Sequence, residues 1–250
     1  MTAASVRAGL RRDGALVRAG LGEVLGSPPL TALYAGIVIV VSALDAAIVS
    51  RTALGPVMAT GDARAVGTVL STAAFFASFV AAGIAYAVLL VVPLTRARTG
   101  GGLVAVLATP VGARRLWWTR SVALWVPSLL AGVLAPAGVL GGLRWLAVPA
   151  GTGSPLDGWL LLATLVAVPV TFLGLSLVVT AVGLTATPAA GNIIAIGFYG
   201  GGSALLGNIV LRAGLGPEAF WWLTAGVAVA TWTAALLLGL RVTTSRVVLA

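Results

Sequence analysis

Six long apolar runs dominate the sequence after residue 28, and short segments rich in glycine, proline or arginine separate them. A helix needs about 20 predominantly apolar residues to cross the hydrocarbon layer of a bilayer, and each run reaches that length. The runs therefore predict membrane-spanning helices near 29–50, 66–94, 117–143, 159–184, 191–211 and 221–240. Pro127 and Pro136 in the third run and Pro169 in the fourth are expected to kink their helices.

The first 28 residues have a different pattern, in which apolar residues recur at helical spacing and arginines flank them. The apolar positions are Val6, Leu10, Val17, Leu21 and Val24, and the flanking arginines are Arg7, Arg11 and Arg18. This pattern predicts an N-terminal amphipathic helix that lies in the membrane interface, and the alternative is a plain basic tail. The segment holds four arginines and no long apolar core, so we do not expect a cleavable signal peptide.

The composition confirms that lipid is the solvent of most of this chain. Hydrophobic residues make up 60% and charged residues 8%, against about 45–50% and about 25% in soluble domains. We therefore expect an all-α membrane protein, with residues 29–250 forming one six-span domain. All fifteen basic residues are arginines, and cysteine and histidine are absent. This excludes a lysine Schiff base, thiol redox chemistry, Cys/His zinc sites and haem ligation by those residues.

The arginines also predict the orientation. Six spans place both termini on one side, and eleven arginines fall on that side against four on the other. The four on the other side are Arg51, Arg64, Arg144 and Arg212. Cytoplasmic loops carry the excess of positive charge, so both termini are expected to be cytoplasmic. Trp117, Trp118, Trp221 and Trp222 occupy positions typical of interfacial aromatic belts. Because topology explains the basic charge, no nucleic-acid partner is expected.

The acidic residues offer little chemistry. The chain has six, and only Asp45 lies inside a predicted span, near its outer end. An acid inside the membrane is a functional hypothesis. Asp45 could instead reach Arg51 or the outer water, and we favour such an interfacial pair. Carriers coupled to protons or sodium need ionisable or polar ligands at mid-depth, in which this chain is poor. No P-loop is present, so the chain is not expected to bind ATP or to act as an enzyme.

A transporter without its own motor must dock one, and the segment between the second and third spans is where we expect this contact. Leu103, Val106 and Leu107 fall on one face of a short helix, and Thr109-Pro110 ends it. Arg114, Arg115 and Arg120 then hold the next span at the inner leaflet. Such a segment could tilt both spans when a partner pushes it. The alternative is an ordinary basic loop.

This layout resembles the permease subunits of type-2 ATP-binding-cassette exporters, whose coupling loop commonly reads E-R-E-x-G-T-L-E-x-L-L-A-T-P-V. The matching residues are Arg98, Gly101, Leu103, Leu107, Ala108, Thr109, Pro110 and Val111. Ala97, Thr99 and Val104 stand where the family often has acids, and Gly102 replaces its threonine. The Ala/Val/Leu/Gly-rich, lysine-free composition is similar to that of small antibiotic-export permeases of actinobacteria.

The resemblance implies a cytoplasmic coupling helix between spans two and three, a homo- or heterodimer of permeases in the cell membrane, and two separate ATPase subunits that hold ATP and Mg²⁺. It also implies export of an amphipathic drug, antibiotic, lipid or glycoconjugate. Two alternatives remain open, which are a permease for haem or metal maturation and a membrane scaffold or sensor that moves nothing.

The fifth span is rich in glycine. Gly200, Gly201 and Gly202 stand in succession, and Gly197 lies one helical turn before Gly201. Three glycines weaken a helix by about 3 kcal/mol relative to alanine. They predict either a hinge near the translocation path or close packing between helices, of which we favour packing.

Overall fold

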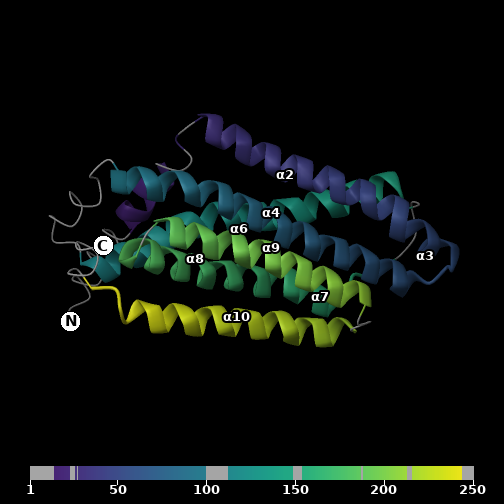
Figure 1. The fold of residues 1–250 in the computed structure, drawn as a ribbon. Helices are drawn as coiled ribbons and strands as arrows, with labels where there is room; N and C mark the ends of the chain where they lie inside the picture. The colour runs from purple at the N-terminus through teal and green to yellow at the C-terminus, as the bar shows by residue number, and fades with distance from the viewer. Residues whose placement is uncertain are drawn as a thin grey trace, which may run out of the picture.

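The computed structural model describes residues 14–22, 26, 28–99, 112–148, 154–186, 188–212 and 216–243. All regular structure in these ranges is helical, and the long helices lie side by side as an elongated bundle (Figure 1). In chain order the elements are α2 Pro28–Val49, η1 Ser50–Leu54, α3 Gly55–Ala59, α4 Ala63–Thr99, α6 Ala113–Leu146, α7 Gly158–Leu162, η2 Ala163–Ala167, α8 Val168–Thr185, α9 Pro188–Arg212 and α10 Pro217–Gly239. The helix of residues 14–22 and the C-terminal end of α10 lie at the same end of the bundle.

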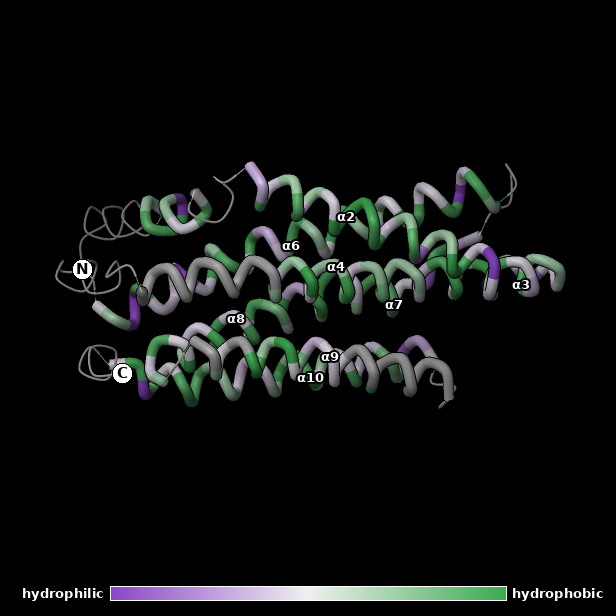
Figure 2. The backbone as a smooth tube through the Cα atoms, turned by 45° about the horizontal axis from the view of Figure 1, so that its top comes forward, coloured by the Kyte–Doolittle hydropathy of each residue, from purple (hydrophilic) through white to green (hydrophobic). Residues whose placement is uncertain are grey.

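Five of these helical segments are long and apolar enough to cross a membrane, which makes the chain a multi-pass membrane protein. They are Pro28–Ala59, Ala63–Ala87, Ala113–Leu146, Gly158–Thr185 and Pro217–Gly239. Helix α9 also runs through the bundle for 25 residues, and its stretch Ile193–Gly202 is a shorter apolar helix by the same criterion. Figure 2 shows hydrophobic residues along the helices and the hydrophilic ones mostly towards their ends.

The first span is longer than the sequence predicted. Its helix does not end at Ser50 but continues to Ala59, and only Thr60–Asp62 separates it from α4. The reason is the π-helical turn η1, which comes just before Pro56. A proline removes a helical N–H and crowds the preceding turn, and a widened turn accommodates both effects. The π-helical turn η2 stands in the same place before Pro169, while α6 continues through Pro127 and Pro136.

Helix α4 occupies the centre because two of its faces are buried. One face carries small residues at four-residue spacing, and these pack against Ala131 and Ala135 of α6. They are Ala73, Ala77, Ala81 and Ala85. Small residues let two helices approach closely, which is how helices associate in lipid. The other face carries Phe75, Phe79 and Tyr86, and it packs against α8.

Indole N–H groups from two neighbouring helices, α6 and α10, bind the backbone of α8. Trp117 and Trp125 of α6 donate to the carbonyls of Leu177 at 2.8 Å and Pro169 at 2.9 Å. Eight residues separate the two donors and eight separate the two acceptors in the opposite direction, which fixes the antiparallel register of the pair. From α10, Trp232 donates to the carbonyl of Val170 at 3.0 Å.

Of the four tryptophans expected in an aromatic belt, two lie on the outside of the bundle and two pack against neighbouring helices, while their depth in the membrane stays a prediction. Trp118 and Trp222 are exposed on the outside of the bundle, as a belt requires. Trp117 is 7% exposed and Trp221 packs against the aromatic core. The other member of each pair turns inwards because neighbouring positions on a helix lie about 100° apart.

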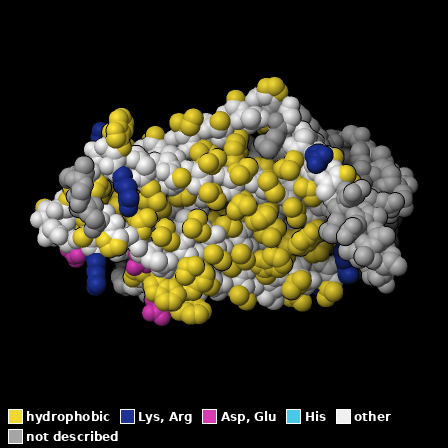
Figure 3. Space-filling model, turned by 180° about the vertical axis from the view of Figure 1, so that it is seen from behind, with side chains coloured by type: hydrophobic (Ala, Val, Ile, Leu, Met, Phe, Trp, Pro, Cys, Tyr) yellow, Lys and Arg dark blue, Asp and Glu magenta, His cyan; other side chains and the backbone are white. Residues whose placement is uncertain are grey.

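Charged side chains stand near the two ends of the bundle, and hydrophobic side chains cover the face between them (Figure 3). The helix of residues 14–22 packs on α6, because a Cβ added at Gly20 would lie 2.9 Å from the Cβ of Ala123. In this helix Arg18 is exposed, while Val17 and Leu21 are half-buried. The remaining residues of the predicted N-terminal amphipathic helix lie outside the described ranges, so its place in the membrane interface stays a prediction.

Candidate functional site

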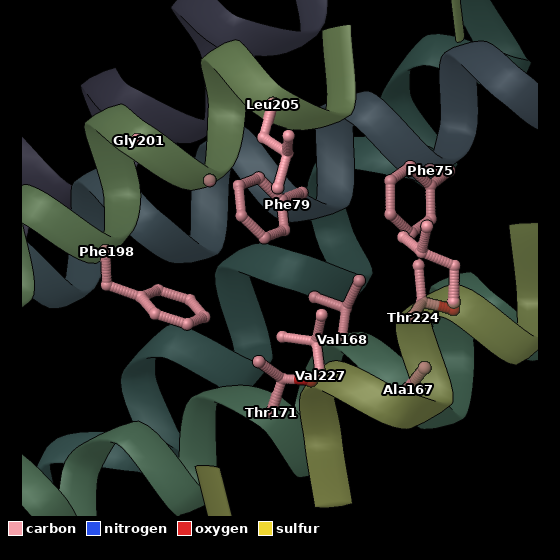
Figure 4. Close-up of a pocket in the computed structure, with 12 residues that line it drawn as sticks. Phe75, Phe79, Ala167, Val168, Thr171, Phe198, Gly201, Leu205, Thr224 and Val227 are labelled. Carbon is pink, nitrogen blue, oxygen red and sulfur yellow. The ribbon is translucent and has the colours of Figure 1, made fainter. Parts of the chain in front are cut away.

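An apolar cavity of about 260 Å³ lies between α4, α8, α9 and α10. Figure 4 shows the side chains of these helices facing a common space, with Phe79 and Phe198 on two of its sides. The lining residues are Phe75, Phe79, Ala167, Val168, Thr171, Phe198, Gly201, Gly202, Leu205, Leu223, Thr224 and Val227. The cavity is close to the lower end of the size range of small-molecule sites, which is about 300–1,000 Å³.

Aromatic rings form the wall on the α4 side. The ring of Phe79 stacks on Phe75 at 6.3 Å between centroids, meets Phe172 of α8 at 5.5 Å and stacks on Tyr199 of α9 at 6.5 Å. Phe75 in turn makes an edge contact with Phe220 of α10 at 4.7 Å. Aromatic pairs in these geometries contribute about 0.5–1.5 kcal/mol beyond area burial. The wall therefore joins four helices and is rigid on one side of the cavity.

The glycine-rich part of α9 also lines the cavity, next to Phe79. A Cβ added at Gly202 would lie 3.3 Å from Cζ of Phe79, so this glycine lets α9 approach the aromatic wall. Positions Gly197, Gly200 and Gly201 have no atom within 4 Å of an added Cβ. From the sequence, we favour close helix packing at these glycines. Within the described part of the chain, Gly202 packs closely against a neighbouring helix, whereas Gly197 and Gly201 have no neighbour within 4 Å. The hinge stays a prediction.

The cavity suits binding and offers no group for acid–base chemistry. No titratable side chain lines it, and its two hydroxyls belong to Thr171 and Thr224. Thr224 already donates to the carbonyl of Trp221 at 2.9 Å in its own helix. Across the described ranges, no group of histidine, cysteine or acidic residues could hold a metal ion. An apolar site with few polar groups binds an apolar or aromatic moiety.

Asp45 does not form the predicted pair with Arg51. Its Oδ2 is buried without a hydrogen-bond partner, and the described residues provide no ion pair between the two side chains. Six residues along a regular helix place two side chains roughly 120° apart, which explains the absence. Because the helix continues to Ala59, Asp45 also lies near the middle of the 32-residue segment and not near its outer end.

Most of the predicted ATPase-coupling segment lies outside the described residues. Gly101, Leu103, Val106, Leu107, Thr109 and Pro110 are all in the range 100–111. The backbone of Arg98 belongs to the last turn of α4, which ends at Thr99. Arg114 and Arg115 lie in the first turn of α6, where Arg114 is exposed and Arg115 half-buried. The structure thus describes the two helices that flank the segment.

The aromatic cavity was not anticipated from the sequence. A signal was available on the second span, since Phe75, Phe79 and Tyr86 recur at the spacing of one helix face. The contributions of α8 and α10 had no comparable signal, because their apolar residues continue all round the helix. Comparison with family models, with curated proteins and with solved structures gives no match to this chain.

Proposed function

We propose that this chain is the membrane-spanning permease subunit of an ATP-driven exporter, similar to type-2 ATP-binding-cassette permeases. In this proposal it crosses the cell membrane six times with both termini in the cytoplasm, pairs with a second permease chain, and moves an amphipathic molecule outward. Separate ATPase subunits bind ATP and Mg²⁺. A haem- or metal-maturation permease is a weaker alternative, because the chain has no histidine or cysteine to hold iron.

The observation that carries the proposal is the aromatic cavity between four helices of an apolar bundle. An amphipathic substrate needs a place for its apolar part, and the apolar lining of this cavity offers one. The cavity borders helix α9, where glycines allow the backbone to bend. A scaffold subunit that moves nothing would not need a coupling segment.

Energy must come from a partner, because the sequence contains no P-loop and few intramembrane ionisable groups. The 103–111 segment is the proposed contact. A short apolar helix face in a water-exposed loop gains burial from a groove on a partner. Force applied there would reach both flanking helices, α4 and α6, of which α4 lines the cavity.

The experiment co-expresses the chain with an ATP-binding-cassette ATPase encoded next to its gene, and measures both partner recovery and export from vesicles. Leu107→Asp should lose the partner, because an unpaired charge in a packed groove costs several kcal/mol. Ala105→Asp is the matched control, since helical spacing places residue 105 on the opposite face of the segment. Pro110→Ala should keep the partner and lose transport.

A second arm tests the cavity. Val227→Trp places a large ring in the cavity and should abolish export while partner recovery stays normal. If Leu103→Asp and Leu107→Asp leave both recovery and export intact, the segment is only a loop and the proposal fails. Export that survives Val227→Trp would instead remove the cavity from the transport path.

A further inference from the structure

A second cavity of about 310 Å³ lies in the cleft between α2 and α4. Its walls are apolar apart from one carboxylate, that of Asp45. The lining residues are Val40, Val41, Leu44, Asp45, Ile48, Phe76, Ala77, Val80 and Ile84. We call this the α2–α4 cleft. It is distinct from the aromatic cavity, with which it shares no lining residue.

The carboxylate in this cleft lacks a partner. Oδ2 of Asp45 is buried and accepts no hydrogen bond. Desolvating a carboxylate in apolar surroundings is costly unless a cation or a hydrogen-bond donor approaches it. Acids inside membrane spans are accordingly rare, and they mark the places where ions or ligands bind.

The lining of the cleft supplies no counter-charge for Asp45. Asp45 lies near the middle of the Pro28–Ala59 segment, and Phe76 to Ile84 lie in the middle part of α4. None of the residues that line the cleft is basic. The cation therefore has to arrive with an apolar body that can enter the hydrocarbon layer.

Access to the cleft is open on the outer side of α2. Leu44 and Ile48 line the cleft and are each 58% exposed. In the bilayer these side chains face lipid, so a molecule dissolved in lipid can reach the cleft without crossing the packed interior. On the inner side, Ala77 is buried and closes the cleft towards α6.

We propose that the α2–α4 cleft binds a lipophilic ammonium ion, whose N–H group donates to the carboxylate of Asp45 while its apolar body contacts Phe76, Val80 and Ile84. The ion pair supplies the charge and the donor that the carboxylate lacks, and the apolar walls fit the body of the ligand. The proposal rests on the exporter function in one respect: if the chain is an exporter, lipophilic ammonium ions are a class of molecule that it transports. Binding itself requires nothing but this chain.

The test measures binding of 1-naphthylmethylammonium to the purified full-length chain in lipid nanodiscs by equilibrium dialysis. The neutral alcohol 1-naphthalenemethanol has the same ring and serves as the uncharged comparison. The ammonium ion should bind saturably and more tightly than the alcohol. Asp45→Asn keeps the shape of the side chain and removes its charge, and it should weaken ammonium binding at least about tenfold with little effect on the alcohol.

Two further variants locate the site. Val80→Phe fills the cleft from α4 and should weaken both ligands, without touching the carboxylate. Asp62→Asn removes an exposed acid at the end of the bundle, where its Oδ1 accepts from the Arg64 N–H at 2.9 Å, and it should leave binding unchanged. Equal ammonium binding by the native chain and Asp45→Asn would overturn the proposal, as would equal affinity for the alcohol or no effect of Val80→Phe.

The same assay separates this inference from the exporter function. Leu107→Asp is expected to lose the ATPase partner, yet it should bind the ammonium ion like the native chain. If the partner assays fail while Asp45-dependent binding persists, the cleft is a ligand site in a protein that is not an exporter. If the partner assays succeed and Asp45→Asn binds normally, the exporter proposal stands and the cleft proposal falls.

Discussion

Helices α2 and α8 have similar apolar sequences and opposite environments. In the most apolar window of the first span, 17% of the residues are buried inside the protein, against 67% in the segment formed by α7, η2 and α8. Helix α8 contacts α6, α9 and α10 and receives three indole hydrogen bonds. Among the long helices that the structure describes, α2 contacts mainly α4 and α6. The difference shows that α8 is held on several sides by neighbouring helices and that α2 is a peripheral helix with space on its flanks.

Polar contacts of α2 are correspondingly few. Tyr34 donates from its hydroxyl to the carbonyl of Pro127 at 2.9 Å, and Ser42 donates to the carbonyl of Ala135 at 3.2 Å. Two cavities flank this helix, namely the α2–α4 cleft and a second one of about 590 Å³ between α2 and α6. Loosely packed elements are the ones that open at low free-energy cost, so α2 is suited to move while α8 stays in place.

The largest effect should come from truncating an aromatic side chain of α8. Phe172 is 1% exposed and contacts Phe79, Tyr86 and Phe198. Phe172→Ala should lower the free energy of unfolding by about 3 kcal/mol through the cavity that it leaves. Ile39 of α2 is 67% exposed, and Ile39→Ala should change stability by under about 0.5 kcal/mol. Unfolding by SDS in mixed micelles measures the free energy of unfolding of both variants. Equal losses of stability would contradict the difference in burial between α8 and α2.

A smaller effect is expected from adding side chains at glycines. A Cβ at Gly174 of α8 would lie 2.7 Å from Oγ1 of Thr231 and 3.1 Å from the Trp232 ring, so Gly174→Val should cost about 1–3 kcal/mol. Gly36 of α2 has nothing within 4 Å, and Gly36→Val should be neutral or slightly stabilising. Unfolding by SDS in mixed micelles again measures the free energy of unfolding of both variants. A destabilising Gly36→Val would mean that another chain covers this face of α2.

The smallest effects come from single hydrogen bonds, which are worth about 0.6 kcal/mol between helices in a membrane. Trp125→Phe removes the donor to Pro169, and Tyr34→Phe removes the donor to Pro127. The two substitutions should lower the free energy of unfolding by similar amounts, but they should loosen different helices. Hydrogen exchange of the backbone should rise only in α2 for Tyr34→Phe and across the bundle for Trp125→Phe. Identical exchange patterns would show that α2 and α8 open as one unit.

Helix boundaries could be predicted where the sequence carries a local stop or start signal. The fourth span was expected at 159–184 and is observed at Gly158–Thr185, because Asp157 caps its N-terminus by accepting from the N–H groups of Trp159 and Leu160. The first span was predicted too short, because a proline that usually ends a helix is absorbed here by a π-helical turn. Whether a helix ends or continues at a proline depends on the geometry of the preceding turn, which the residue types do not specify.

The sequence alone determined that the chain is helical and spans a membrane, since long apolar runs and the near absence of charge leave no other stable arrangement in lipid. Only the tertiary structure decided which sides of the helices meet. Helices such as α8 are apolar all round, so their pattern cannot distinguish a lipid-facing side from a buried one. The aromatic cavity, the indole bonds to α8 and the unpartnered carboxylate of Asp45 all depend on that choice, because each is made by residues from different helices or by the absence of a neighbouring partner.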